Sequence, residues 1–140
     1  MKRASLIACI LVVSACSSNA VSEPTTTVPE DSSITMAFVG DILPHSPLVA
    51  RAQRNEQAFS PMFEDITPLI ASADLAICHL ETPIAPQGEE LSTFPFFGVP
   101  PTITEAIAKA GFDRCSTASN HTYDRGVNGI DETVNALLAN

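Results

Sequence analysis

The stretch DLAICHLE, from Asp74 to Glu81, decides the fold class. It is apolar almost throughout, it is shorter than an ordinary helix, and it ends in a carboxylate. Continuous apolar runs of this length are typical of strands in a parallel sheet that is covered on both faces. The run therefore predicts a buried parallel strand that contains His79 and carries Glu81 at its carboxyl end.

Two other segments have the composition of strands, one before this run and one after it. Residues 34–39, ITMAFV, lead directly to Gly40 and Asp41, and residues 114–119, RCSTAS, form a weaker strand. Both are bounded by residues that favour turns, as short strands usually are. Three strands are therefore expected.

The segments between these strands are predicted to be helical or irregular. Residues 61–72 have apolar side chains at helical intervals, although Pro68 weakens this helix. Residues 102–110 form a second helix that ends at Gly111. Residues 82–100 are rich in proline and have no steady period, so they predict a long excursion.

A last helix is predicted to begin near Val127. Its apolar residues are expected to form one stripe that faces the core, namely Ile130, Val134, Leu137 and Leu138. Strands that alternate with helices indicate an α/β fold with a largely parallel sheet and flanking helices.

Residues that can bind metals follow or end each predicted strand. They are Asp41 with His45, His79 with Glu81, and Asn120 with His121, and they include all 3 histidines of the chain. Ligands collect beyond the carboxyl ends of parallel strands. Carboxylate, imidazole and amide groups suit a divalent transition metal, and two bridged metals suit phosphoester chemistry. The pattern therefore predicts a site for one or two divalent ions.

Each of these residues also has an ordinary structural interpretation. Asp41 and Asn120 are common turn residues, His79 fits a packed position in its strand, and Glu81 fits a solvated strand end. Asp124 can likewise be a turn residue, and His121 can be an exposed loop residue. The coincidence at three strand ends favours a site over these separate explanations.

The N-terminal residues predict export and a membrane anchor. Residues 1–15 have basic, apolar and small residues in the order of a secretory signal peptide, and the apolar run is too short to span a membrane. Residues 13–16, VSAC, fit a bacterial lipobox, which makes Cys16 the expected lipidation site. An ordinary cleavage site near residues 18–20 is the alternative. Residues 16–33 predict a flexible tether, and residues 34–140 a domain outside the cytoplasm.

The charge of the chain limits its partners. It has 7 basic and 16 acidic side chains, a net charge of −9, and loss of Lys2 and Arg3 with the signal leaves 5 basic side chains and −11. Such a surface excludes nucleic acid as a partner. It would also repel an anionic polymer, unless bound cations turn a cluster of carboxylates into an anion site.

Cys78 and Cys115 are the cysteines left in the predicted domain. A location outside the cytoplasm permits a disulfide between them. The interpretation that we favour from the sequence is that both are small buried apolar residues. No cysteine spacing of a zinc finger is present.

The sequence resembles a known family in three blocks. Gly40-Asp41, residues 79–84 (HLETPI), and residues 118–126 (ASNHTYDRG) with Gly129 and Thr133 after them are similar to the bacterial capsule synthesis protein CapA family. The resemblance covers essentially all of residues 34–140. It implies a calcineurin-like metallophosphatase fold, a role in poly-γ-glutamate capsule synthesis, and attachment to the membrane.

The resemblance also implies roles for individual residues. Asp41 matches the first metal-binding aspartate of the metallophosphatases, Glu81 stands in place of a bridging aspartate, and Asn120 matches a metal-binding asparagine. His121 matches the histidine that donates a proton or contacts phosphate, and we expect Asp124 to orient it.

His45 departs from the metallophosphatase pattern. It follows Asp41 by four residues, whereas the family has its histidine two residues after the aspartate. His45 is therefore expected to be a ligand only through loop geometry.

Metallophosphatases complete their site with histidines from later strands, and nothing follows Asn140 here. We therefore expect a truncated domain that binds metal weakly and is not active alone. The leading hypothesis is a cell-surface metal-dependent hydrolase of phosphoesters or amides, or an accessory of a ligase, with a capsule-export machinery as its partner. The alternatives are a non-catalytic lipoprotein that binds an anionic polymer, and a chain that does not fold.

Overall fold

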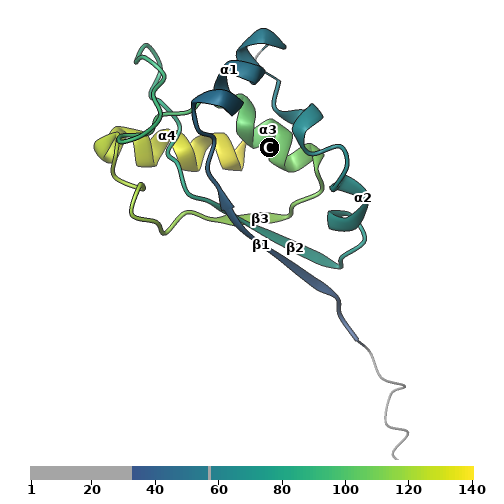
Figure 1. The fold of residues 1–140 in the computed structure, drawn as a ribbon. Helices are drawn as coiled ribbons and strands as arrows, with labels where there is room; N and C mark the ends of the chain where they lie inside the picture. The colour runs from purple at the N-terminus through teal and green to yellow at the C-terminus, as the bar shows by residue number, and fades with distance from the viewer. Residues whose placement is uncertain (1–32, 57) are drawn as a thin grey trace, which may run out of the picture. The chain divides into compact units, whose positions relative to one another are not determined.

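The computed structural model describes residues 33–56 and 58–140 (Figure 1). The predicted signal peptide, the tether and the lipidation site Cys16 lie outside these residues. The elements in chain order are β1 (Met36–Ile42), α1 (Ser46–Arg54), η1 (Ser60–Met62), α2 (Thr67–Ile70), β2 (Leu75–Leu80), α3 (Thr102–Lys109), β3 (Arg114–Ser116) and α4 (Gly126–Leu138). Within the described ranges, none of the helices has the length and apolar character needed to cross a membrane.

The three strands form one parallel sheet in the order β1-β2-β3. This confirms the α/β class and the parallel sheet. The structure differs from the prediction in β1, which continues through Asp41 to Ile42 instead of ending before Gly40. The register with β2 shifts between Phe38 and Asp41, and after the shift Asp41 lies opposite His79.

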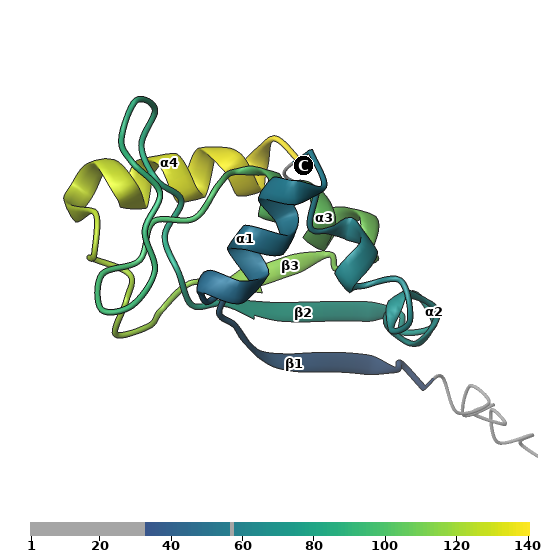
Figure 2. The same ribbon diagram turned by 45° about the horizontal axis from the view of Figure 1, so that its top comes forward.

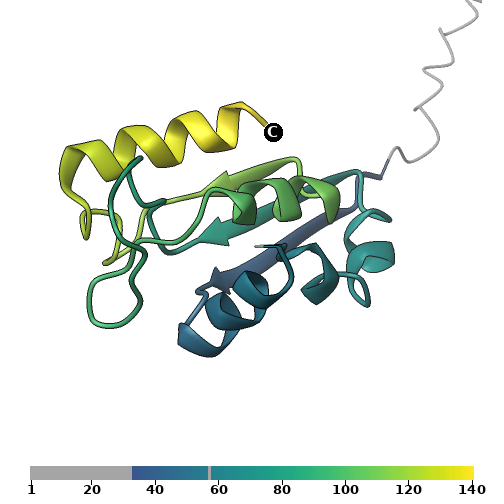
Figure 3. The ribbon, with the colours of Figure 1, turned by 90° about the horizontal axis from the view of Figure 1, so that it is seen from above.

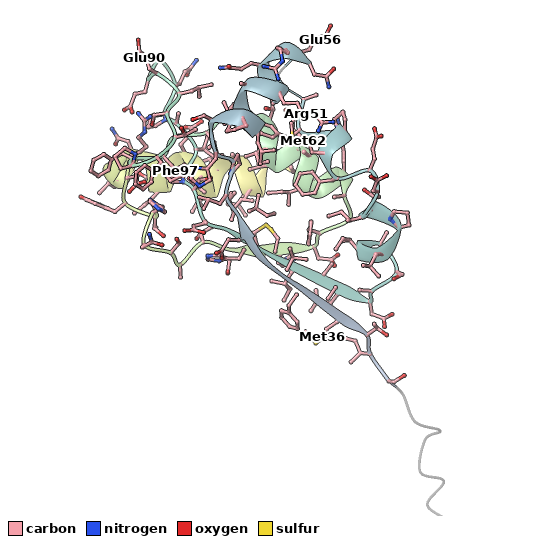
Figure 4. All side chains as sticks on the ribbon, viewed as in Figure 1. Met36, Arg51, Glu56, Met62, Glu90 and Phe97 are labelled. Atoms are coloured by element: carbon pink, nitrogen blue, oxygen red, sulfur yellow. A yellow bond between two sulfur atoms is a disulfide. The ribbon has the colours of Figure 1, made fainter. Side chains whose placement is uncertain are left out.

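The helices α1, α3 and α4 lie on one face of the sheet (Figures 2 and 3). Side chains alternate along β2: Ala76, Cys78 and Leu80 are buried on the helix side, and the residues between them are half-buried. Met36 projects from the opposite side of the sheet (Figure 4). The prediction that β2 is covered on both faces is therefore wrong for the described residues, because an apolar run does not reveal how many layers cover it.

One predicted helix differs from the structure, one agrees with it, and one observed helix was not predicted. The segment 61–72 is divided into η1 and α2 instead of forming one helix, since Pro68 stands in the first turn of α2 and lacks the N–H that a continuous helix needs. The helix α3 begins and ends within one residue of its prediction, and Gly111 follows it at φ +96°. The helix α1 was missed, although Val49 and Ala52 are spaced to face the core.

Only part of the apolar stripe predicted for α4 faces the core: Ile130 is half-buried and Leu137 packs against the buried cluster. Val134 is 44% exposed and Leu138 is 81% exposed, whereas Gly129 and Thr133 are buried. Thr133 Oγ1 accepts a hydrogen bond of 2.8 Å from the N–H of Ile84 and donates one of 2.6 Å to the carbonyl of Gly129. The helix therefore approaches the backbone after β2 closely, and only small side chains fit on the side that it buries.

Arg125, at the start of α4, holds the excursion of residues 82–100 in place. Its guanidinium donates to the carbonyls of Phe97 (3.1 Å) and Glu90 (2.8 Å), and it also binds Ser92 Oγ and the carboxylate of Glu89. A Cβ at Gly98 would lie 2.3–2.5 Å from this guanidinium. The glycine is thus required for the arginine to reach the loop.

Cys78 and Cys115 form a disulfide between β2 and β3, and their Cα atoms lie 4.5 Å apart. The interpretation of the two residues as unpaired apolar side chains is therefore wrong. The reason is the strand register, which places these two cysteines directly opposite each other. The two cysteines are 37 residues apart in the sequence, and this separation does not indicate that they pair.

Loss of this disulfide is predicted to destabilise the domain. The double variant Cys78→Ala/Cys115→Ala should lose about 2–4 kcal/mol of unfolding free energy, since the bond closes a long loop in the unfolded chain. Urea unfolding of oxidised wild type and variant measures the difference. Reductant should lower the stability of the wild type but leave that of the double variant unchanged; equal urea midpoints for oxidised wild type and variant would contradict the prediction.

Candidate metal centre

Two of the candidate ligands, Asp41 and Glu81, lie near the carboxyl ends of β1 and β2. Asp41 of β1 lies opposite His79 of β2, and Glu81 follows β2 by one residue. The N–H of Glu81 donates to the carbonyl of Ile42, at 3.3 Å, so the end of β1 holds the backbone that carries this carboxylate. Asp41 and Glu81, predicted from separate segments, are therefore brought to the same edge of the sheet.

Glu81 is a buried carboxylate whose hydrogen bonding is incomplete. Its side chain is 11% exposed, and Oε1 lies 4.0 Å from Nε2 of His121, beyond hydrogen-bonding distance. Among the described residues, Oε2 has no hydrogen-bond partner. A buried carboxylate oxygen without a donor is costly, so this position favours a bound cation.

His121 is held by Asp124 with its free nitrogen toward Glu81. Its Nδ1 lies 2.7 Å from Oδ2 of Asp124, and the same oxygen accepts a hydrogen bond of 2.7 Å from the N–H of Phe97. The Asp124 carboxylate thereby fixes the imidazole between the excursion and α4. Histidine ligands and general acids are commonly oriented in this way by a carboxylate.

The loop that carries Asn120 is held by short local hydrogen bonds. The N–H of Ser119 donates to Thr122 Oγ1 at 2.9 Å, and that hydroxyl donates to the carbonyl of Thr117 at 2.5 Å. Asn120 is exposed, and its Oδ1 accepts a hydrogen bond of 3.2 Å from Ser119 Oγ. The amide oxygen is thus available at the surface, beside His121.

His79 and Asp41 form a second facing pair. His79 Nε2 lies 3.8 Å from Oδ1 of Asp41, and His79 Nδ1 makes a 2.6 Å hydrogen bond with Ser116 Oγ of β3. The Asp41 side chain is 64% exposed and that of His79 is 22% exposed. This pair is therefore more open to solvent than Glu81 and His121.

His45 and His121 contact the same aromatic ring, that of Phe97. Phe97 is fully buried, and its ring makes edge contacts with His45, at 5.2 Å between centroids, and with His121, at 4.6 Å. His45 itself is exposed at the start of α1. Its role as a metal ligand stays a prediction.

Three residues of this region were missed by the sequence analysis as contributors to the site. Ser116 and Phe97 contact the histidines, and Arg125 fixes the loop that carries Phe97. A serine in a strand and one phenylalanine of three in residues 94–97 carry no distinctive local signal. Arg125 directly follows Asp124 in the third block of the resemblance, and this position was the sequence signal that could have identified it.

A family model described as bacterial capsule synthesis protein PGA_cap matches residues 35–140, which include Asp41, His79, Glu81, Asn120 and His121. The chain belongs to this PGA_cap family. It is accordingly a capsule synthesis protein, and the resemblance proposed from the three sequence blocks is confirmed. A comparison with curated proteins finds no match to the chain.

The donor types of this PGA_cap chain suit a divalent metal, but the described residues bring them together only in pairs. In residues 33–56 and 58–140, no three His, Cys, Asp or Glu side chains cluster closely enough to hold an ion. The two facing pairs, Asp41–His79 and Glu81–His121, leave gaps of 3.8 and 4.0 Å. An ion that binds two donors at about 2.0–2.2 Å each keeps them about 3–4 Å apart. The gap between Asp41 and His79 and the unpartnered Glu81 oxygen therefore suit such an ion.

Replacement of Glu81 by glutamine is predicted to remove the stabilisation that metal gives this PGA_cap chain. Wild type should gain about 2.7 kcal/mol at a Mn²⁺ concentration 100 times its dissociation constant, whereas E81Q should gain little. Without metal, E81Q should melt no lower than wild type, because it removes a buried charge that lacks a donor. Thermal unfolding with EDTA and with Mn²⁺ measures both effects.

The control for this experiment is E105Q, which removes one exposed carboxylate on α3. Its response to Mn²⁺ should equal that of wild type. An Mn²⁺ response in E81Q as large as in wild type would show that Glu81 does not bind the ion.

Proposed function

We propose that this capsule synthesis protein is a metal-dependent hydrolase that acts on a phosphoester or amide bond outside the cytoplasm. The observation that carries the proposal is the buried Glu81 carboxylate, whose Oε2 lacks a partner among the described residues and whose Oε1 faces His121. A buried carboxylate oxygen without a donor destabilises the fold unless a cation or a donor binds it, and this supports a cation site.

Asp41, Glu81 and Asn120 are proposed to hold the metal, with His45 as a further ligand. These residues supply carboxylate, amide and imidazole donors, which suit one or two divalent ions. A divalent ion would supply Lewis-acid activation of the phosphoryl or carbonyl oxygen and of the attacking water.

His121 is proposed to move the proton during hydrolysis. Its Nε2 faces the site, so it can donate a proton to the leaving group, while Asp124 accepts the hydrogen bond from Nδ1 and stabilises the charged ring. Phe97 covers one side of His121 and limits the access of water to it. The reaction then depends on the hydrogen bond between Asp124 and the N–H of Phe97, which keeps these groups together.

The proposal predicts metal-dependent turnover that requires His121. Full chain loaded with Mn²⁺ or Zn²⁺ is assayed with bis(p-nitrophenyl) phosphate and, separately, with poly-γ-glutamate. His121→Ala should lower the rate about 10²–10⁴-fold, as expected for loss of a general acid. Asp41→Asn should lower it through loss of metal. Asp131→Asn, which changes an exposed carboxylate on α4, is the matched control and should retain the wild-type rate.

The same assay separates hydrolysis from the alternative function, which is binding of an anionic polymer through bridging cations. The donors of the described residues lie in pairs, and a pair of donors is enough to hold a cation that bridges the protein to an anionic polymer. Metal-dependent polymer binding without turnover would support the clamp. Full activity in both His121→Ala and Asp41→Asn, or no metal uptake, would contradict the hydrolase.

We also propose that lipid on Cys16 anchors the protein to the outer side of the cell membrane, where an export machinery could deliver its substrate. The lipobox of residues 13–16 supports this. In the native host, Cys16→Ser should lose incorporation of a labelled fatty acid and leave the membrane fraction. Cys9→Ser, within the apolar part of the signal, is the control and should be labelled normally. Labelling of Cys16→Ser at the wild-type level would contradict the anchor.

A further inference from the structure

We propose that His79 is a metal ligand that acts together with Asp41, and that Ser116 positions its ring. The inference rests on the proposed function, since it assumes that this edge of the sheet binds a divalent ion. It assigns the more exposed facing pair to the ion, in addition to the buried carboxylate of Glu81.

The register shift in β1 is the first observation. Between the pairs Phe38–Ile77 and Asp41–His79, β1 advances by three residues and β2 by two. Without the extra residue, Gly40 would lie opposite His79 and Asp41 would turn to the other face of the sheet. Bulges of this kind re-aim side chains next to active sites. Here the irregularity places a carboxylate opposite an imidazole.

The orientation of the His79 ring is the second observation. Ser116 Oγ lies 2.6 Å from Nδ1, which leaves Nε2 directed toward Oδ1 of Asp41 at 3.8 Å. This distance is too long for a hydrogen bond and falls within the range for two donors that share one ion. With a hydrogen on Nδ1 donated to Ser116, the lone pair of Nε2 is free for the metal.

The two histidines of the edge repeat the same arrangement. In His121, Nδ1 is held by Asp124 at 2.7 Å and Nε2 faces Glu81 at 4.0 Å; in His79, Ser116 and Asp41 take the corresponding places. Glu81 follows His79 by two residues, one residue beyond the end of β2. Each of the two carboxylates therefore faces an imidazole whose other nitrogen is held by a hydrogen bond.

A structural role alone does not explain His79. An ion pair with the largely exposed Asp41 would add little stability in water. A histidine that only filled space beside Ile77 would not need Ser116 to fix its ring. Fixing one ring nitrogen so that the other is presented to a ligand is what partners of metal-binding histidines do.

Zinc binding by the full chain tests the proposal. Isothermal titration with Zn²⁺ should show that His79→Ala binds at least about 10-fold more weakly than wild type. Ser116→Ala should weaken binding about 10–100-fold, as for loss of an outer-shell partner, and Ser116→Thr should restore it because it keeps the hydroxyl. Ser72→Ala, an exposed serine after α2, should bind like wild type. Melting curves in EDTA identify any variant that does not fold.

A second measurement uses wild type alone and so does not depend on folding of a variant. In protein labelled with ¹⁵N-histidine, Zn²⁺ should shift the Nε2 resonance of His79 strongly and leave Nδ1 protonated. If wild type binds Zn²⁺ but the His79 resonances do not move, or His79→Ala binds as tightly, the assignment of His79 is overturned and the proposed function stands. If wild type takes up no Zn²⁺, the proposed function fails and the His79 assignment with it.

Discussion

Parallel pairing of β2 with β1 on one side and β3 on the other sets the position of every group at the carboxyl edge of the sheet. Because the three strands run in the same direction, Asp41, Glu81 and the loop with Asn120 and His121 leave the sheet at the same end. The disulfide between Cys78 and Cys115 links β2 to β3 one residue before His79 and Ser116 face each other. The pairing thus decides both the fold and the distances in the candidate site.

A second group of contacts holds the loops above this edge. Arg125 binds several groups of the excursion, Thr133 receives the N–H of Ile84, and Asp124 receives the N–H of Phe97. Asp124 and Arg125 directly precede α4 and Thr133 lies in its middle, so this helix and the turn before it fix the excursion and His121 together. Small side chains on the buried side of α4 permit this close approach. These polar contacts position the helix together with Ala136 and Leu137, which pack against the core.

Much of the fold could be predicted from local patterns. The apolar run of β2, the turn residues around it and the helical spacing of α3 are properties of short segments, and each was found close to its observed place. Two errors are local: the helix α1 was missed, and residues 61–72 form two short helices. The other errors involve relations between segments. The disulfide, the open face of the sheet in the described residues and the outward-facing Val134 and Leu138 all depend on what packs against a segment. Hydrophobic periodicity identifies an apolar side but not the partner that occupies it.

The sequence by itself determined that the chain is an α/β protein of a capsule synthesis family, with carboxylate, amide and imidazole groups after its strands. These features follow from residue type and spacing along the chain. Only the tertiary structure decided which groups face each other: Asp41 with His79 because of one extra residue in β1, and His121 with Glu81 because Asp124 turns the ring. Strand register and ring orientation arise from contacts between distant segments, and a shift of one residue moves a side chain to the opposite face.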